Sequence, residues 1–139
     1  MAERVLPPVR RPFRALVETC VPEAEGLSAE QWARAEAAVE SSLAPRPAAM
    51  KKQLRRFIRA VNWLSVGRHG RPFTGLDRER RTSFLRSLEK APSLLVRRGV
   101  WGVRSLSFMA YYGLPEVREA IGYRARAEGW AARRGDGGR

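Results

Sequence analysis

Apolar side chains recur at helical spacing in several separate segments, and this periodicity constrains the fold more than any other feature of the chain. The clearest example is the segment 48–66, where one side of a helix would carry Met50, Leu54, Phe57, Ile58, Val61 and Leu64. Such a stripe, with polar residues opposite, is typical of an amphipathic helix that packs on a core. No run of alternating β-branched residues predicts a strand. The sequence therefore predicts an all-α fold.

Prolines and capping residues divide the rest of the chain into further helices. Proline cannot continue the helical hydrogen-bond ladder, so Pro22 ends a helix that starts at residue 12. Ser28 and Gln31 have the spacing of a capping box, which begins a second helix with Trp32, Ala35, Val39 and Leu43 facing inward. Asp77 is expected to cap a fourth helix. Five main helices and one short C-terminal helix result.

A chain of 139 residues is long enough to bury about two-thirds of its unfolded surface in a single domain. We predict an extended lead-in over 1–11, one compact helical domain over 12–123, and a basic, disordered tail over 124–139. Gly67 is the expected C-terminal cap of the helix 48–66. His69 then falls in a loop, where we expect a solvated side chain.

The fifth helix, 93–112, is apolar on almost every side. A helix of this kind is either central in a protein or covered by another protein, and in so small a chain we expect both. Aromatic residues are enriched at protein interfaces. The predicted partner interface comprises Trp101, Phe108, Tyr111, Tyr112 and Tyr123. The alternative for Tyr111 and Tyr112 is a core position with the rings buried and the hydroxyls wet.

A turn is predicted where the fifth helix ends. Gly113 is suited to cap that helix, Pro115 to start a short one, and Gly122 to end the short one. If the glycines adopt positive φ, a β-branched side chain at either position will disrupt the turn.

The net charge of +13 is concentrated in the middle of the chain. Residues 51–104 carry fifteen Lys and Arg against three acidic residues, a net +12. One face of the helix 48–66 is predicted to be basic, with Lys51, Lys52, Arg55, Arg56 and Arg59. A basic face attracts phosphates, so nucleic-acid binding is an alternative function, and a merely solvated face is the other interpretation.

The sequence offers little for catalysis. Cys20 is the only cysteine and lies on the apolar side of a helix, which favours a buried thiol. The acidic residues form no metal-ligand spacing, and no glycine-rich phosphate loop is present. The chain by itself is therefore not expected to be an enzyme, and we expect it to bind no metal or cofactor. Three arginines within the longest apolar region argue against a membrane span.

One segment resembles a known family. Met109-Ala-Tyr-Tyr112, then Pro115-Glu-Val, then Ala120-Ile-Gly-Tyr123, is similar to the C-terminal signature of the gluconate 2-dehydrogenase subunit 3 family. The segments 14–22 and 77–88 are similar to the family's opening and middle helices. The family comprises the small, or gamma, subunits of FAD-dependent dehydrogenases of the glucose-methanol-choline class.

The resemblance implies a non-catalytic accessory subunit in a hetero-oligomeric oxidoreductase complex. Its partner would be the large flavoprotein subunit, which carries the FAD and oxidises an alcohol or sugar. The small subunit would support the folding, flavin loading or stability of that partner. Unlike many members, this sequence has no twin-arginine export signal, so we expect a cytoplasmic location or export with a partner. Arg124-Ala-Arg-Ala replaces the family's glycine-proline turn. An unrelated helical interaction module is the further alternative.

Overall fold

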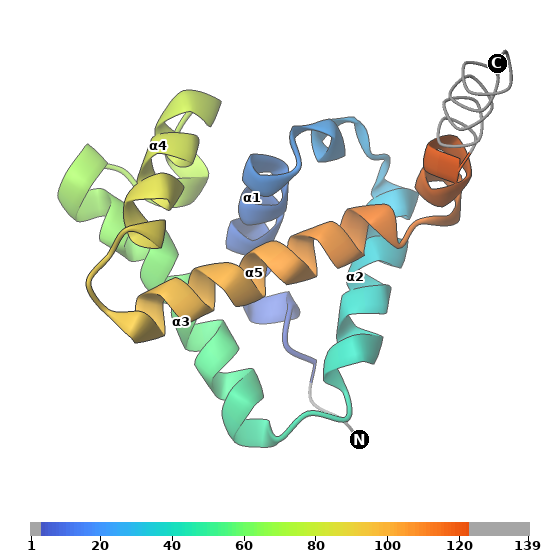
Figure 1. The fold of residues 1–139 in the computed structure, drawn as a ribbon, viewed down its shortest axis with the longest axis horizontal. Helices are drawn as coiled ribbons and strands as arrows, with labels where there is room; N and C mark the ends of the chain where they lie inside the picture. The colour runs from blue at the N-terminus through green and yellow to red at the C-terminus, as the bar shows by residue number, and fades with distance from the viewer. Residues whose placement is uncertain (1–3, 123–139) are drawn as a thin grey trace, which may run out of the picture.

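The computed structural model describes residues 4–122, and the regular structure in this range is entirely helical (Figure 1). Its α-helices are α1 (Arg10–Cys20), α2 (Ala29–Leu43), α3 (Ala48–His69), α4 (Arg78–Glu89) and α5 (Leu94–Tyr112). Residues 115–122 form a further short helix. The predicted all-α class, with five main helices and a short one, is confirmed. Tyr123 and the predicted tail lie outside the described residues.

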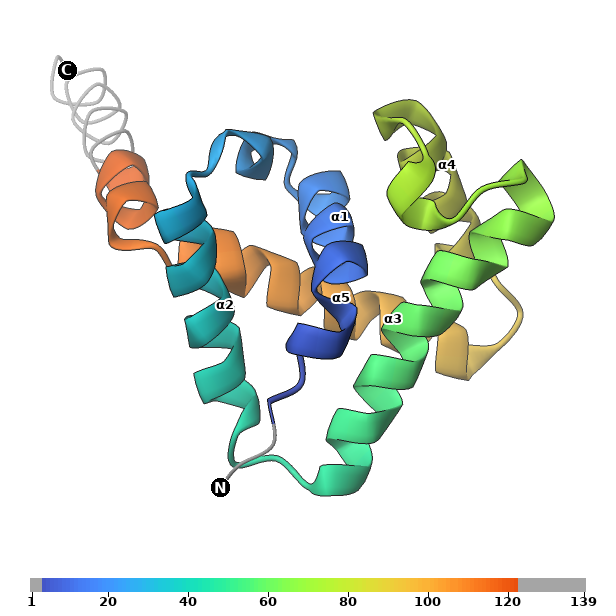
Figure 2. The same ribbon diagram turned by 180° about the vertical axis from the view of Figure 1, so that it is seen from behind.

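Helix α5 lies across the other helices. Figure 1 shows it passing in front of α1, α2 and α3, and Figure 2 shows these three in front of it from behind. α5 packs against α1, α2 and α4, whereas α3 packs on α1 and on two 3₁₀ helices. The fully buried side chains between them include Phe13, Leu16, Val17, Val39, Ile58, Val61 and Val100.

Two predicted helix starts are confirmed in atomic detail. The Ser28 hydroxyl accepts the Gln31 N–H at 3.1 Å, and the Gln31 side chain accepts the Ser28 N–H at 2.9 Å. The Asp77 carboxylate accepts the Arg80 N–H at 2.8 Å. The first turn of a helix leaves its N–H groups without partners, and these side chains supply them.

The N-terminal segment is helical and buried rather than extended. Residues Pro7–Val9 form the 3₁₀ helix η1, and α1 follows without a break. The extended lead-in predicted over 1–11 is therefore wrong for 7–11. Burial of apolar surface favours this arrangement, because three side chains of the segment are at most 1% exposed: Val5, Leu6 and Val9.

Two glutamates of α2 bind the N-terminal segment and the start of α1. Glu40 accepts the backbone N–H of Val5 at 2.9 Å and that of Leu6 at 2.9 Å, which gives buried donors the partners they need. Glu36, one turn earlier and buried, is paired with two arginines of α1, Arg10 at 3.1 Å and Arg14 at 2.8 Å. Helix α2 is thereby joined to the start of the chain.

The end of α3 differs from the prediction. The helix continues through Gly67 to His69, and Gly70 is the left-handed cap, with a φ of 75°. His69 thus belongs to the last turn, with its ring edge-on to Phe84 at 6.0 Å between centroids. The prediction of a solvated loop side chain is wrong, since Nε2 is buried and has no hydrogen-bond partner among the described residues.

The turn after α5 has right-handed backbone geometry. Gly113 lies at φ −77° and ψ −15°, and Gly70 is the one residue between 4 and 122 with positive φ. The condition of positive φ, on which the expected effect of a β-branched residue at Gly113 or Gly122 depended, is therefore not met. Crowding explains the glycine at 113, because a Cβ there would stand 2.4 Å from the Met109 carbonyl oxygen. Pro115 starts the short helix as predicted.

Candidate protein-interaction surface

The side of α5 that faces away from the core carries a continuous row of exposed residues. They recur at alternating steps of four and three: Leu94, Arg98, Trp101, Ser105, Phe108 and Tyr112. We call this row the outer stripe of α5. Trp101 is 70% exposed, Leu94 54%, Phe108 40% and Tyr112 39%. Side chains at this spacing share one face of a helix. The stripe is therefore a largely apolar surface open to solvent.

The opposite side of α5 is covered by the rest of the protein. Its buried residues are Val100, Val103, Ser107 and Ala110. Ser107 is fully buried, and its hydroxyl donates to the Val103 carbonyl at 2.8 Å, so its polar atom is satisfied within the helix. The sequence of α5 is apolar on almost every side, but in the structure one half of the helix is buried in the core and the other half is exposed to solvent.

The predicted interface aromatics are not all on this surface. Trp101, Phe108 and Tyr112 share the outer stripe, and the Phe108 and Tyr112 rings lie 5.9 Å apart between centroids. Tyr111 is half-buried against the core and meets the Tyr112 ring edge-on at 5.1 Å. The structure therefore places Tyr111 beside the stripe rather than in it. Tyr123 lies outside the described residues.

Three members of the stripe were not predicted as interface residues. Leu94, Arg98 and Ser105 complete the row, and Leu95 beside it is 74% exposed. Spacing from Trp101 is the signal that could have found them, since Leu94 lies seven residues before Trp101, as Phe108 lies seven after it. This spacing identifies exposed residues only once it is known which side of the helix is covered.

One residue of the predicted basic face of α3 is buried. Lys51 is 9% exposed, and its Nζ donates to the Ala44 carbonyl at 3.0 Å. The assignment of Lys51 to an exposed basic face is therefore wrong, and Arg55 is half-buried. An exposed row remains at steps of four, three and four, which we call the α3 row: Lys52, Arg56, Arg59 and Trp63. Trp63 is 63% exposed.

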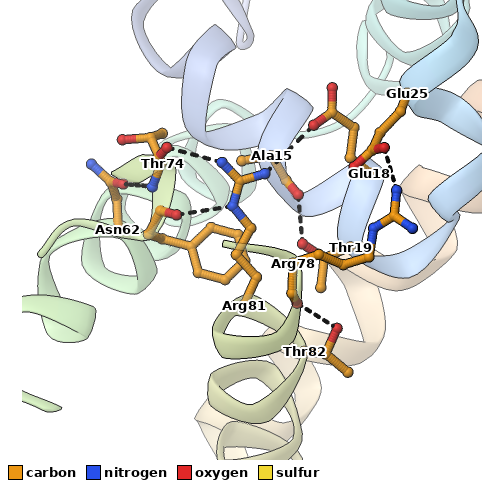
Figure 3. A network of polar contacts seen from close by, with 10 residues as sticks. Ala15, Glu18, Thr19, Glu25, Asn62, Thr74, Arg78, Arg81 and Thr82 are labelled. Carbon is orange, nitrogen blue, oxygen red and sulfur yellow. Dashed lines mark hydrogen bonds and ion pairs between the residues drawn. The ribbon is translucent and has the colours of Figure 1, made fainter. Parts of the chain in front are cut away.

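Two arginines of α4 contact neighbouring elements of the fold. Arg81 donates to the carbonyls of Phe73 and Thr74 at 3.1 and 2.9 Å, and it lies 3.5 Å from a Glu18 carboxylate oxygen (Figure 3). Arg78 pairs with Glu25 in the same view. These contacts tie α4 to α1 and to the loop after α3. Arg78 and Arg81 are thus engaged in contacts within the protein.

A cavity of about 370 Å³ lies between α1, α4 and α5. Cys20 lines it, and burial raises the pKa of this thiol, against the opposing effects of Ser107 and Arg104. A raised pKa keeps sulfur in the unreactive thiol form. Two hydroxyls at the cavity are engaged with helix carbonyls, as Thr19 donates to Ala15 and Thr82 to Arg78 (Figure 3). Nothing in the lining pairs a nucleophile with a base.

Neither a metal site nor a membrane span is found in the described part of the chain. Among residues 4–122, no group of three or more His, Cys, Asp or Glu is placed to hold a metal ion. None of the described helices has the length and apolar character needed to cross a bilayer. No family model, curated protein or solved structure was found to match the chain.

Proposed function

We propose that the protein is a non-catalytic accessory subunit that binds a larger protein through the outer stripe of α5. The observation that carries this proposal is the exposure of Trp101, Phe108 and Tyr112 in one row. Exposed aromatic residues in a contiguous patch mark interaction surfaces, and Trp and Tyr are frequent energetic centres of interfaces.

The family resemblance suggests the identity of the partner. The segment Met109–Tyr112 and its continuation to Tyr123 resemble the signature of small subunits that accompany FAD-dependent dehydrogenases of the glucose-methanol-choline class. Tyr112, the last residue of the outer stripe, lies in this segment. We therefore propose that the partner is such a flavoprotein, that it carries the FAD, and that this chain contributes no catalytic group.

The proposal is tested by capture of the partner. The tagged full-length chain is expressed in its native host and purified, and the co-purifying protein is identified by mass and by its absorbance spectrum. We expect a larger yellow protein with a flavin spectrum. In the variant Trp101→Ala/Phe108→Ala, the affinity should fall at least tenfold, as for central interface aromatics. Purification without a protein partner overturns the proposal.

Trp63→Ala is the matched control. Trp63 is 63% exposed and Trp101 is 70% exposed, so both substitutions remove an exposed indole from a helix surface. Only Trp101 belongs to the outer stripe. Equal losses of affinity in the two variants would show that binding does not use α5 specifically.

Binding of nucleic acid along α3 is a second candidate, favoured by the alignment of Trp63 with three cations in the α3 row. Cations and a stacking aromatic together are the usual elements of a single-strand binding surface. With three phosphate contacts to a single strand, raising the salt from 50 to 200 mM would weaken binding about twentyfold. A labelled single-stranded oligonucleotide titrated at both salt concentrations tests this candidate, and binding unchanged by Arg56→Glu/Arg59→Glu would exclude it.

A further inference from the structure

We propose that the outer stripe of α5 receives a single amphipathic helix of the partner, with acidic residues at the end that lies against Arg97 and Arg98. This inference rests on the proposed function and specifies the structural element and the charge of the partner's contact surface.

The spacing of the stripe is that of a helix-packing seam. Leu94, Trp101 and Phe108 are separated by seven residues, and so are Arg98, Ser105 and Tyr112. A repeat of seven keeps one face of a helix against a second helix that crosses at about 20°. The row spans eighteen residue steps, or about 27 Å of helix axis. A partner helix of about five turns would cover it.

The helical backbone of α5 excludes β-strand addition, which is another common mode of peptide binding. Strand addition needs a row of unpaired N–H and C=O groups at a sheet edge. No strand is present among residues 4–122, and α5 uses its backbone groups in its own helix from residue 94 to residue 112. Recognition at the stripe must therefore use side chains at helical spacing.

The residues beside Trp101 have small side chains, which leaves room for a side chain of the partner. A Cβ on Gly102 would meet open space. Ser105, one turn after Trp101, turns its hydroxyl back to the Trp101 carbonyl at 3.0 Å. A large exposed ring next to small residues suits packing between two helices, where the projecting side chain of one helix needs space on the other.

The charge of the surface is uneven along its length. Arg97 and Arg98 are exposed near the start of α5 and have no partner among the described residues. Arg104, farther along, is paired with Glu89. A second copy of this chain would bring the same two arginines and a net charge of +13, so like charges oppose self-association. An acidic partner segment fits, and a helix C-terminus at this end would add favourable dipole charge.

Photo-crosslinking of the purified complex tests the inference. p-Benzoylphenylalanine is introduced in three separate full-length variants, Leu94→p-benzoylphenylalanine and the same replacement of Trp101 and of Phe108. We expect all three to crosslink to one continuous partner segment, at positions displaced by about seven residues from one variant to the next. An antiparallel helix would give these positions in descending order.

The outcomes separate this inference from the proposed function. Crosslinks to one protein but to scattered segments of it would overturn the single helix and leave the accessory-subunit proposal standing. Crosslinks to a second copy of this chain, or to lipid, would overturn the helix and its acidic character. If no site yields a crosslinked protein while circular dichroism shows folded variants, both proposals fail.

Charge reversal at Arg97 and Arg98 tests whether the partner helix carries acidic residues at the end that contacts them. Arg97→Glu/Arg98→Glu should weaken binding of the isolated partner at least tenfold, and acid-to-lysine changes at the crosslinked partner segment should restore it. Arg56→Glu/Arg59→Glu on α3 is the matched control, with the same change in net charge and an expected effect below about twofold. Equal losses in the two double variants would contradict a specific acidic end.

Discussion

The ring of Phe57 lies directly against the backbone of Gly99, where α3 meets α5. A Cβ atom on residue 99 would stand 2.4 Å from the Phe57 ring, which is closer than real carbon atoms approach. The absence of a side chain at this position therefore lets the start of α5 lie on α3, with Phe57 half-buried between them.

Gly99→Val should destabilise the protein by about 1 to 3 kcal/mol, because the added branches force the Phe57 ring or α5 itself to move. Chemical denaturation followed by circular dichroism measures the free energy of unfolding. Combining the change with Phe57→Ala should recover part of the loss that is due to the clash. Gly102→Ala is the control: its Cβ meets open space, and alanine should gain up to about 1 kcal/mol over glycine in a helix.

Glu40→Ala should release the N-terminal segment from α2. The change removes the acceptor for two buried N–H groups, those of Val5 and Leu6, and should cost about 2 kcal/mol in the free energy of unfolding. Hydrogen exchange of the amides at residues 5 and 6 should accelerate more than that of α4. Glu30→Ala, on the exposed first turn of α2, should leave the exchange of these two amides unchanged. Unchanged exchange in Glu40→Ala would contradict the anchoring role.

Lys51→Glu and Lys52→Glu should differ sharply, although the residues are adjacent. The first places a carboxylate at a buried position facing the Ala44 carbonyl, which is unfavourable. The second alters an exposed side chain and should change the free energy of unfolding by less than about 0.5 kcal/mol. Thermal melting of both variants gives the comparison. Equal melting temperatures would show that Lys51 lies in solvent.

Cys20 should make stability depend on alkaline pH. Burial raises the pKa of this thiol above its ordinary value, with the nearby Ser107 and Arg104 side chains opposing the effect. The folded state therefore disfavours the thiolate, and the contribution of the group is complete below the ordinary thiol pKa and is lost as pH rises through the folded-state pKa.

The free-energy difference between the native protein and Cys20→Ser should accordingly shrink between neutral and strongly alkaline pH. Iodoacetamide should alkylate Cys20 more slowly in the folded protein than in urea at the same pH, since the thiolate is the nucleophile. Alkylation at equal rates in both states would contradict the burial of the thiol.

Much of the fold follows from local signals in the sequence. The capping box at Ser28, the cap at Asp77 and the stop before Pro22 act within a few residues, so their effect does not depend on distant parts of the chain. Helical periodicity likewise identified the all-α class and the inward residues of α2, which are buried. The predicted partner, its cofactor and the non-catalytic role remain predictions.

The tertiary structure decided which side of each apolar helix is covered. The segment 48–66 has an apolar arc wide enough for either of two orientations. Packing placed Ile58 and Val61 inside and left Met50 and Leu64 exposed. Lys51 entered the boundary of the core because a carbonyl seven residues away could accept its ammonium group. Contacts of this kind depend on where other helices lie, which no local pattern specifies.

The outer stripe of α5 shows the same division. The sequence alone determined that residues 93–112 form a helix with apolar groups around its circumference, since hydrophobicity and helical spacing are properties of the residues themselves. Only the docking of α1, α2 and α4 on one side decided that Val100 and Val103 are buried and that Trp101 and Phe108 are exposed. Neighbouring helices pack on one side of α5 only, so the residues of the opposite half stay exposed to solvent.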